Sequence, residues 1–133
     1  MEDFSLAQGK GVCYPGDDFN EWYPWMREKN MKSFEDSNQS FYIAYEKEKP
    51  VGVCLSITHN GTAGIYAFTT LHEYRKQGIS TSIMKSVMIE CTNNNIQVIT
   101  LQVNTNSYAN DFYKMLGFTD EFECKTFQSA MNI

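Results

Sequence analysis

The chain has 133 residues with a net charge of −5, and 42% of the residues are hydrophobic while 20% are charged. This length and composition indicate one globular domain with a hydrophobic core, and they exclude a disordered chain. The acidic balance argues against a nucleic-acid-binding protein, because phosphate contacts require basic surfaces.

The cysteines and the first residues indicate the cellular compartment in which the protein is expected. The four cysteines lie far apart and form no C-x-x-C pair, so they predict neither a zinc site nor a redox motif, and we expect no disulfides. They are Cys13, Cys54, Cys91 and Cys124. No apolar run follows the acidic start at residues 1–3. We therefore expect no signal peptide, no membrane span and a cytoplasmic location.

The first forty residues carry few regular signals. Glycines and a proline punctuate residues 1–16, which predicts a loop with at most a short strand. Asp17 or Asp18 is suited to cap a helix that begins near Phe19. Pro24 is compatible with that helix only in its first turn. The aromatic residues of this helix are interpreted as core packing in preference to a substrate wall.

A change of period marks the next three elements. Residues 41–45, 51–57 and 63–70 are predicted as strands, and within 51–57 apolar residues alternate with small or polar ones. A charged turn at 46–50 and the pair Asn60-Gly61 separate them. The pattern predicts an antiparallel meander.

The second half of the chain alternates helix and strand. Apolar residues step by four from Ile79 to Cys91, which predicts a helix, and the β-branched run 96–103 predicts a buried central strand. A second helix is expected at 107–116, closed by Gly117, with a last strand at 118–127. The fold class is therefore α/β (α+β), a mixed, largely antiparallel sheet with helices on its faces.

The turn between the third strand and the first of these helices is the most informative segment. Residues 74–80 read Tyr-Arg-Lys-Gln-Gly-Ile-Ser. A helix start leaves backbone N–H groups unpaired at the positive end of its dipole, and Gly78 leaves their approach open. Arg75 and Lys76 add positive charge. The segment lacks both the G-x-G-x-x-G and the G-x-x-x-x-G-K-S/T patterns. It predicts a pyrophosphate site on the amides from Gln77 to Thr81.

Two motifs resemble those of the GCN5-related N-acetyltransferases. Residues 75–80 are similar to the acyl-CoA signature R/Q-x-x-G-x-G/A, with Ser80 where glycine or alanine is usual. Residues 106–118 resemble N-x-x-A-x-x-L/F-Y-x-x-x-G-F. The resemblance covers residues 41–127 of a single acyl-CoA N-acyltransferase-like domain spanning 1–133. The segment 1–40 is atypical, and the whole is similar to the C-terminal part of longer or tandem members.

The resemblance implies an acetyl-CoA (coenzyme A) co-substrate and no metal. The pantetheine arm is expected along the third strand, where that strand and the 96–103 strand splay apart, and Asn106 is expected to contact the arm. Asn106 also suits a helix cap for residues 107 onward, and both roles are compatible. The expected cofactor-binding residues are Phe68, Thr69, Thr70, Arg75, Lys76, Gln77, Gly78, Ile79, Ser80, Thr81 and Asn106.

By the same resemblance Tyr113 is the catalytic residue, with its hydroxyl directed at the departing sulfur; the alternative is a packed helix tyrosine beside Phe112. The implied reaction is direct attack of a small-molecule or peptide amine on the acetyl thioester in a ternary complex. No general base is assigned; the candidates are His59, His72, Glu73, Glu21 and the acids at 17–18. The alternatives are a non-catalytic acyl-CoA-binding module, sensory or degenerate, and an interaction domain without cofactor. A homodimer through a sheet edge is left open.

Overall fold

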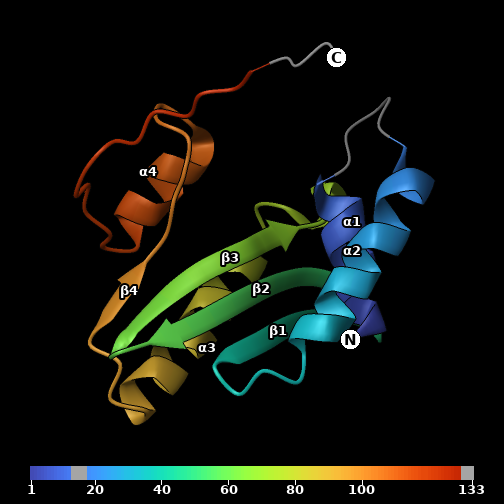
Figure 1. Cartoon of the computed structure of the whole chain (residues 1–133), viewed down its shortest axis with the longest axis horizontal. Helices are drawn as coiled ribbons and strands as arrows, with labels where there is room; N and C mark the ends of the chain where they lie inside the picture. Colours follow the sequence, from blue (N-terminus) through green and yellow to red (C-terminus); the bar gives the residue numbers. More distant parts are fainter. Residues whose placement is uncertain (13–17, 130–133) are drawn as a thin grey trace. The chain divides into compact units, whose positions relative to one another are not determined.

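The computed structural model describes residues 1–12 and 18–129. The chain divides into two compact units, Met1–Leu101 and Gln102–Ile133, and each is described by itself (Figure 1). The first unit holds the sheet and most of the helices: α1 (Glu2–Val12), α2 (Phe19–Ser33), β1 (Gln39–Glu46), β2 (Lys49–His59), β3 (Thr62–Thr70), the 3₁₀ helix η1 (His72–Tyr74), α3 (Ile79–Asn93) and β4 (Val98–Thr100). The second holds α4 (Tyr108–Met115).

The sheet has the order β1-β2-β3-β4. The first three strands pair antiparallel, which confirms the predicted meander. β4 pairs parallel with β3, so the sheet is mixed and largely antiparallel. The prediction of a long, buried central strand at 96–103 is wrong. β4 has three residues, lies at the edge of the sheet, and leaves Val98 51% exposed. An edge strand has one unpaired side, so its β-branched run does not require burial.

Helices pack on both faces of the sheet. Val53 of β2 is fully buried in a cluster with Phe4 and Ala7 of α1. The preceding residue, Gly52, lies against Ile79 and Ile83 of α3. Because successive residues of a strand point to opposite faces, α1 and α3 cover opposite faces of the sheet. Figure 1 shows α3 behind the strands.

The predicted loop at residues 1–16 is wrong where the structure describes it, because residues 2–12 form α1. The two glycines that suggested a loop are buried in the helix. A Cβ at Gly9 would lie 2.7 Å from the Phe19 ring, and one at Gly11 would lie 2.2 Å from Thr69 Cγ2. These glycines therefore permit close packing, and that gain outweighs their poor helix propensity.

The predicted helix after Asp18 is confirmed. The Asp18 carboxylate caps α2 by accepting hydrogen bonds from the amides of Asn20 and Glu21. Asp17 lies outside the described residues. Pro24 is the sixth helical residue, beyond the first turn to which the sequence reasoning confined it. Trp22 and Trp25 are 53% and 57% exposed, so the prediction that they pack in the core is wrong.

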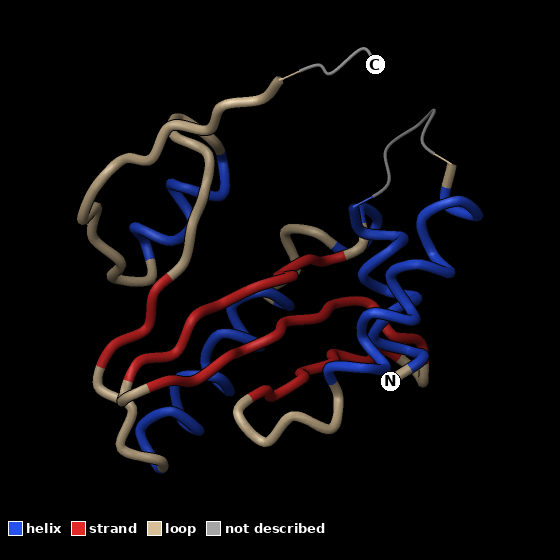
Figure 2. The backbone as a smooth tube through the Cα atoms, viewed as in Figure 1, coloured by secondary structure: helices blue, strands red, loops and turns tan. Residues whose placement is uncertain are grey.

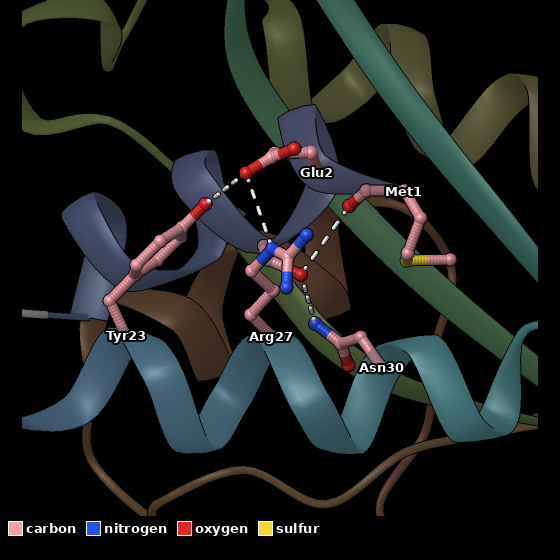
Figure 3. Close-up of polar contacts among 6 residues, drawn as sticks. Met1, Glu2, Tyr23, Arg27 and Asn30 are labelled. Atoms are coloured by element: carbon pink, nitrogen blue, oxygen red, sulfur yellow. Dashed lines mark hydrogen bonds and ion pairs between the residues drawn. The ribbon is translucent and has the colours of Figure 1, made fainter.

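A polar seam joins α1 to α2 (Figure 3). The Glu2 carboxylate accepts from the Tyr23 hydroxyl and from Arg27 Nε. The buried Asn30 amide donates to Ser5 Oγ at 3.0 Å, and Ser5 Oγ donates to the Met1 carbonyl. Buried polar groups are stable only when they are hydrogen-bonded, so this pairing fixes the register of the two helices.

The second unit is built around α4. Ser107 caps the helix, because its Oγ accepts from the Asn110 amide, and Gly117 ends it with φ of 98°. The helix prediction is confirmed. The predicted strand at 118–127 is wrong: within the described residues, the chain after α4 is irregular (Figure 2). A strand needs a neighbouring strand to pair with its backbone N–H and C=O groups, and local sequence does not specify one.

Candidate functional site

The turn between β3 and α3 has the backbone shape of an anion site. After η1 the chain passes through Lys76 with φ of 61° and Gly78 with φ of 84°, and α3 begins at Ile79. A Cβ at Gly78 would meet no atom within 4 Å, so the space beside this residue is open. Left-handed and right-handed residues in succession aim their N–H groups into one concavity. The turn therefore offers an accessible cluster of donors.

The backbone amides at the start of α3 give this turn a partial positive charge. The first intrahelical bond runs from the Ser82 amide to the Gly78 carbonyl, at 3.0 Å. Among the described residues, no side chain caps this helix. The amides of Ile79, Ser80 and Thr81 therefore lie ahead of the helical hydrogen-bond ladder, at the positive end of the dipole. A diphosphate suits these donors.

Two of the predicted site residues meet directly. Thr70 Oγ1 and Ser80 Oγ share a hydrogen bond of 2.7 Å, and Thr70 is 5% exposed. This bond holds the end of β3 to the first turn of α3. The serine that departs from the family signature therefore has a structural partner. Lys76 and Gln77 are exposed. The side-chain amide of Gln77 donates to the Glu73 backbone carbonyl.

The Arg75 side chain donates hydrogen bonds to two backbone carbonyls. Its Nε donates to the Thr70 carbonyl at 3.0 Å, and its Nη2 donates to the Gly11 carbonyl at 3.2 Å. Sequence reasoning expected Arg75 to supply positive charge for a ligand, and it missed Gly11. No local signal marks a carbonyl 64 residues away as the partner of an arginine.

A β-bulge sets the faces of the strand that leads into the turn. Val53 pairs with Thr69 and Leu55 pairs with Tyr66, so β3 has one residue more than β2 in this interval. Ala67 takes φ of 51° there. The extra residue places Thr69 against Gly11 of α1 and Thr70 against Ser80 of α3. No local sequence signal indicates this bulge, because alanine has no preference for positive φ.

The pairing of β3 with β4 is short. It covers Thr62–Gly64 of β3 and ends at Thr100 of β4. The part of β3 that contains Phe68, Thr69 and Thr70 lies beyond this ladder, as the prediction of a splayed strand pair requires.

Two of the predicted site residues, Asn106 and Tyr113, belong to the second unit. Asn106 has φ of 58° and precedes the cap, so Ser107 takes the capping role that Asn106 also suited. The ring of Tyr113 makes edge contacts with the rings of Phe112 and Phe118, at centroid distances of 5.4 and 5.7 Å. These contacts fix the ring plane.

The candidate bases differ in their surroundings. His72 and Glu73 belong to η1, directly before the turn, and both are exposed. The Asp18 carboxylate is occupied by the α2 cap. His59 lies at the end of β2, where Nε2 contacts the Asn60 side-chain amide. Among the described residues, no group of three or more His, Cys, Asp or Glu could hold a metal ion.

Two cysteines of the first unit are buried. Cys54 of β2 and Cys91 of α3 are buried free thiols on the α3 face of the sheet. Burial raises the pKa of the Cys54 thiol to about 12, and it also raises the pKa of Cys91. The thiolate is the reactive form, so these residues act as small apolar side chains. No described helix combines the length and apolarity needed to cross a membrane.

The chain matches a model of the acetyltransferase (GNAT) domain over residues 8–128. It therefore belongs to the GNAT acetyltransferase family. The match begins inside α1, so it includes the end of α1 and the whole of α2, which the sequence resemblance left out. No curated protein sequence matches the chain significantly.

Solved structures share the fold. A transcriptional regulator from Bacillus halodurans is 20% identical, with a TM-score of 0.78 over 96% of this chain and 92% of that one. An aminoglycoside acetyltransferase from an uncultured soil metagenomic sample, crystallised with trehalose, is 21% identical, with a TM-score of 0.67 over 79% and 74%. The acetyltransferase AAC(6')-Iy, in complex with the bisubstrate analog CoA-S-monomethyl-acetylneamine, is 13% identical, with a TM-score of 0.75 over 98% and 91%.

Proposed function

We propose that the protein is an N-acetyltransferase that moves an acetyl group from acetyl-CoA to an amine. The observation that carries the proposal is the turn at residues 75–81, which presents free helix-start amides beside an open glycine in a chain of the GNAT family. The structure of a fold neighbour with a coenzyme A conjugate supports the same co-substrate.

The residues of the turn fit a diphosphate. The amides from Gln77 to Thr81 would hold its oxygens, and hydrogen bonds to a charged acceptor are worth roughly 1.5–3 kcal/mol each. Ser80 and Thr70 keep the donors fixed through their mutual hydrogen bond. The pantetheine arm would follow Phe68, Thr69 and Thr70 of β3, beyond the end of the β4 ladder, with Asn106 as a further contact.

Bound acetyl-CoA supplies an electrophilic thioester: the amine nitrogen forms a bond to the carbonyl carbon, the carbon–sulfur bond breaks, and the amine loses a proton to a base. The Tyr113 hydroxyl then interacts with the departing sulfur. A phenol has a reference pKa near 10 and a thiol one near 8.5, so complete transfer costs about 2 kcal/mol. The Tyr113 hydroxyl therefore acts best by donating a hydrogen bond to the thiolate as its charge develops.

A non-catalytic acyl-CoA-binding module is the second candidate. One observation favours it: a fold neighbour with a TM-score of 0.78 carries the name of a transcriptional regulator, not of an enzyme. Both candidates require coenzyme A binding, and they differ in turnover.

The test has two stages. Calorimetry with coenzyme A measures binding, and release of free thiol from acetyl-CoA then measures transfer across aminoglycosides, polyamines, amino acids and lysine peptides. We expect binding, together with thiol release that depends on one class of amine. Binding without release for every amine would favour the module, and absence of binding would refute both candidates.

A further inference from the structure

Arg75 belongs to the cofactor signature, yet its side chain bonds two backbone carbonyls. Both hydrogen bonds are within ordinary length, at 3.0 Å to Thr70 and 3.2 Å to Gly11. A guanidinium presents its donors in a rigid fork, so one Arg75 head can fix two acceptors at once. These bonds use two of the five N–H donors of the guanidinium, and they link the end of β3 to α1 beside the turn.

The two carbonyls belong to different elements. Thr70 ends β3, while Gly11 is the last residue but one of α1. The final carbonyls of a helix have no intrahelical donor and carry partial negative charge. Arg75 therefore caps the carboxyl end of α1 with a positive group. Direct contact reinforces this link, since the space where a Gly11 Cβ would lie is filled by Thr69.

We infer that Arg75 is a positioning residue. It couples ligand binding at residues 75–81, called here the diphosphate turn, to the order of the carboxyl end of α1. The inference rests on the proposed function, since it requires that the turn binds coenzyme A. Arg75 stands at the first position of the turn, so an anion that orders the turn also fixes the base of its side chain. The fork then restrains the Gly11 carbonyl. Coupling of this kind is reciprocal, so a well-ordered α1 end also favours binding.

Hydrogen exchange measured by mass spectrometry tests the coupling. Wild type, Arg75→Lys and Lys76→Gln are compared with and without saturating coenzyme A. Lysine keeps the charge but lacks the fork, while Lys76→Gln removes a neighbouring charge that makes no recorded bond to α1 in the described residues. We expect coenzyme A to slow exchange at Gly9–Val12 about tenfold in wild type, the scale of one charged hydrogen bond.

The variants then separate positioning from charge. Lys76→Gln should bind coenzyme A more weakly and still show the slowed exchange. Arg75→Lys should lose the slowed exchange at coenzyme A concentrations that saturate it. An effect on exchange that depends on ligand is not expected of a residue that only stabilises the fold. If Arg75→Lys does not fold, Arg75→Gln replaces it, and the wild-type response is still measured.

Two results would overturn the coupling while the proposed function stands. In the first, coenzyme A binds wild type by calorimetry and leaves exchange at Gly9–Val12 unchanged. In the second, Arg75→Lys retains the full ligand response. If calorimetry shows no binding to wild type, the proposed function is refuted, and the coupling falls with it.

Discussion

The proposal that the turn at residues 75–81 binds a diphosphate can be tested at Gly78. We compare Gly78→Glu with the matched variant Gly78→Gln. Both side chains must adopt the positive φ of 84° observed at this position, which costs about 1–2 kcal/mol for an L-residue. Neither meets a protein atom at the Cβ position, because no atom lies within 4 Å. The two variants should therefore lose the same stability and differ only in charge.

Coenzyme A binding should separate the two variants. At about 5 Å, two like charges repel by about 1–3 kcal/mol for an effective dielectric constant between about 80 and 20. We expect the Kd of Gly78→Glu to exceed that of Gly78→Gln by about tenfold, in the lower part of that range, since the site is exposed and screened. Calorimetry at low and high salt measures both, and the difference should shrink with salt. Equal affinity of the two variants, or wild-type affinity of both, would refute the assignment of the turn.

Three further predictions follow from single residues. Tyr113→Phe should lower kcat by about 100-fold or more with little change in the Kd of coenzyme A, measured by thiol release and calorimetry; unchanged kcat would remove the catalytic role. Gly11→Ala should destabilise the protein by about 1–3 kcal/mol in urea, because its Cβ would lie 2.2 Å from Thr69 Cγ2, and adding Thr69→Ser should restore part of the loss. The buried Cys54 thiol has its pKa raised to about 12, against about 8.5 in the unfolded chain, so the folded state binds more protons between these values. Stability should therefore fall as pH rises from about 9 to about 12, by at most about 1.4 kcal/mol per pH unit, and Cys54→Ala should show a smaller slope in urea titrations at a series of pH values.

Local signals predicted the meander and the turn. The Asn60-Gly61 pair and the alternation in β2 specify a hairpin by themselves, and Gly78 before an apolar stripe specifies a helix start. These patterns depend on residues close in sequence, so the structure confirms β1, β2, β3 and α3. The turn between β3 and α3 could be located for the same reason.

Features set by distant contacts could not be predicted. Gly9 and Gly11 are typical of loops, yet Phe19 and Thr69 pack so closely that α1 requires residues without a Cβ. The partner of Arg75 is likewise a carbonyl on another element. The sequence analysis predicted a strand at 118–127, but pairing depends on a neighbour that local sequence does not specify. Tertiary context overrides propensity at each of these positions.

Because of the bulge at Ala67, the number of residues in β3 decides which helix each of the residues at its end contacts. Adjacent strand residues always face opposite sides of the sheet, and the one extra residue that precedes Thr69 and Thr70 decides which of them faces α1 and which faces α3. Loss of any single residue between the Asn60-Gly61 hairpin and Ala67 would exchange their facings, turning the Ser80 partner toward α1. Natural variation in this strand should therefore occur by substitution and not by insertion or deletion. The exposed hairpin at residues 46–49, by contrast, can change length without exchanging the faces of Thr69 and Thr70.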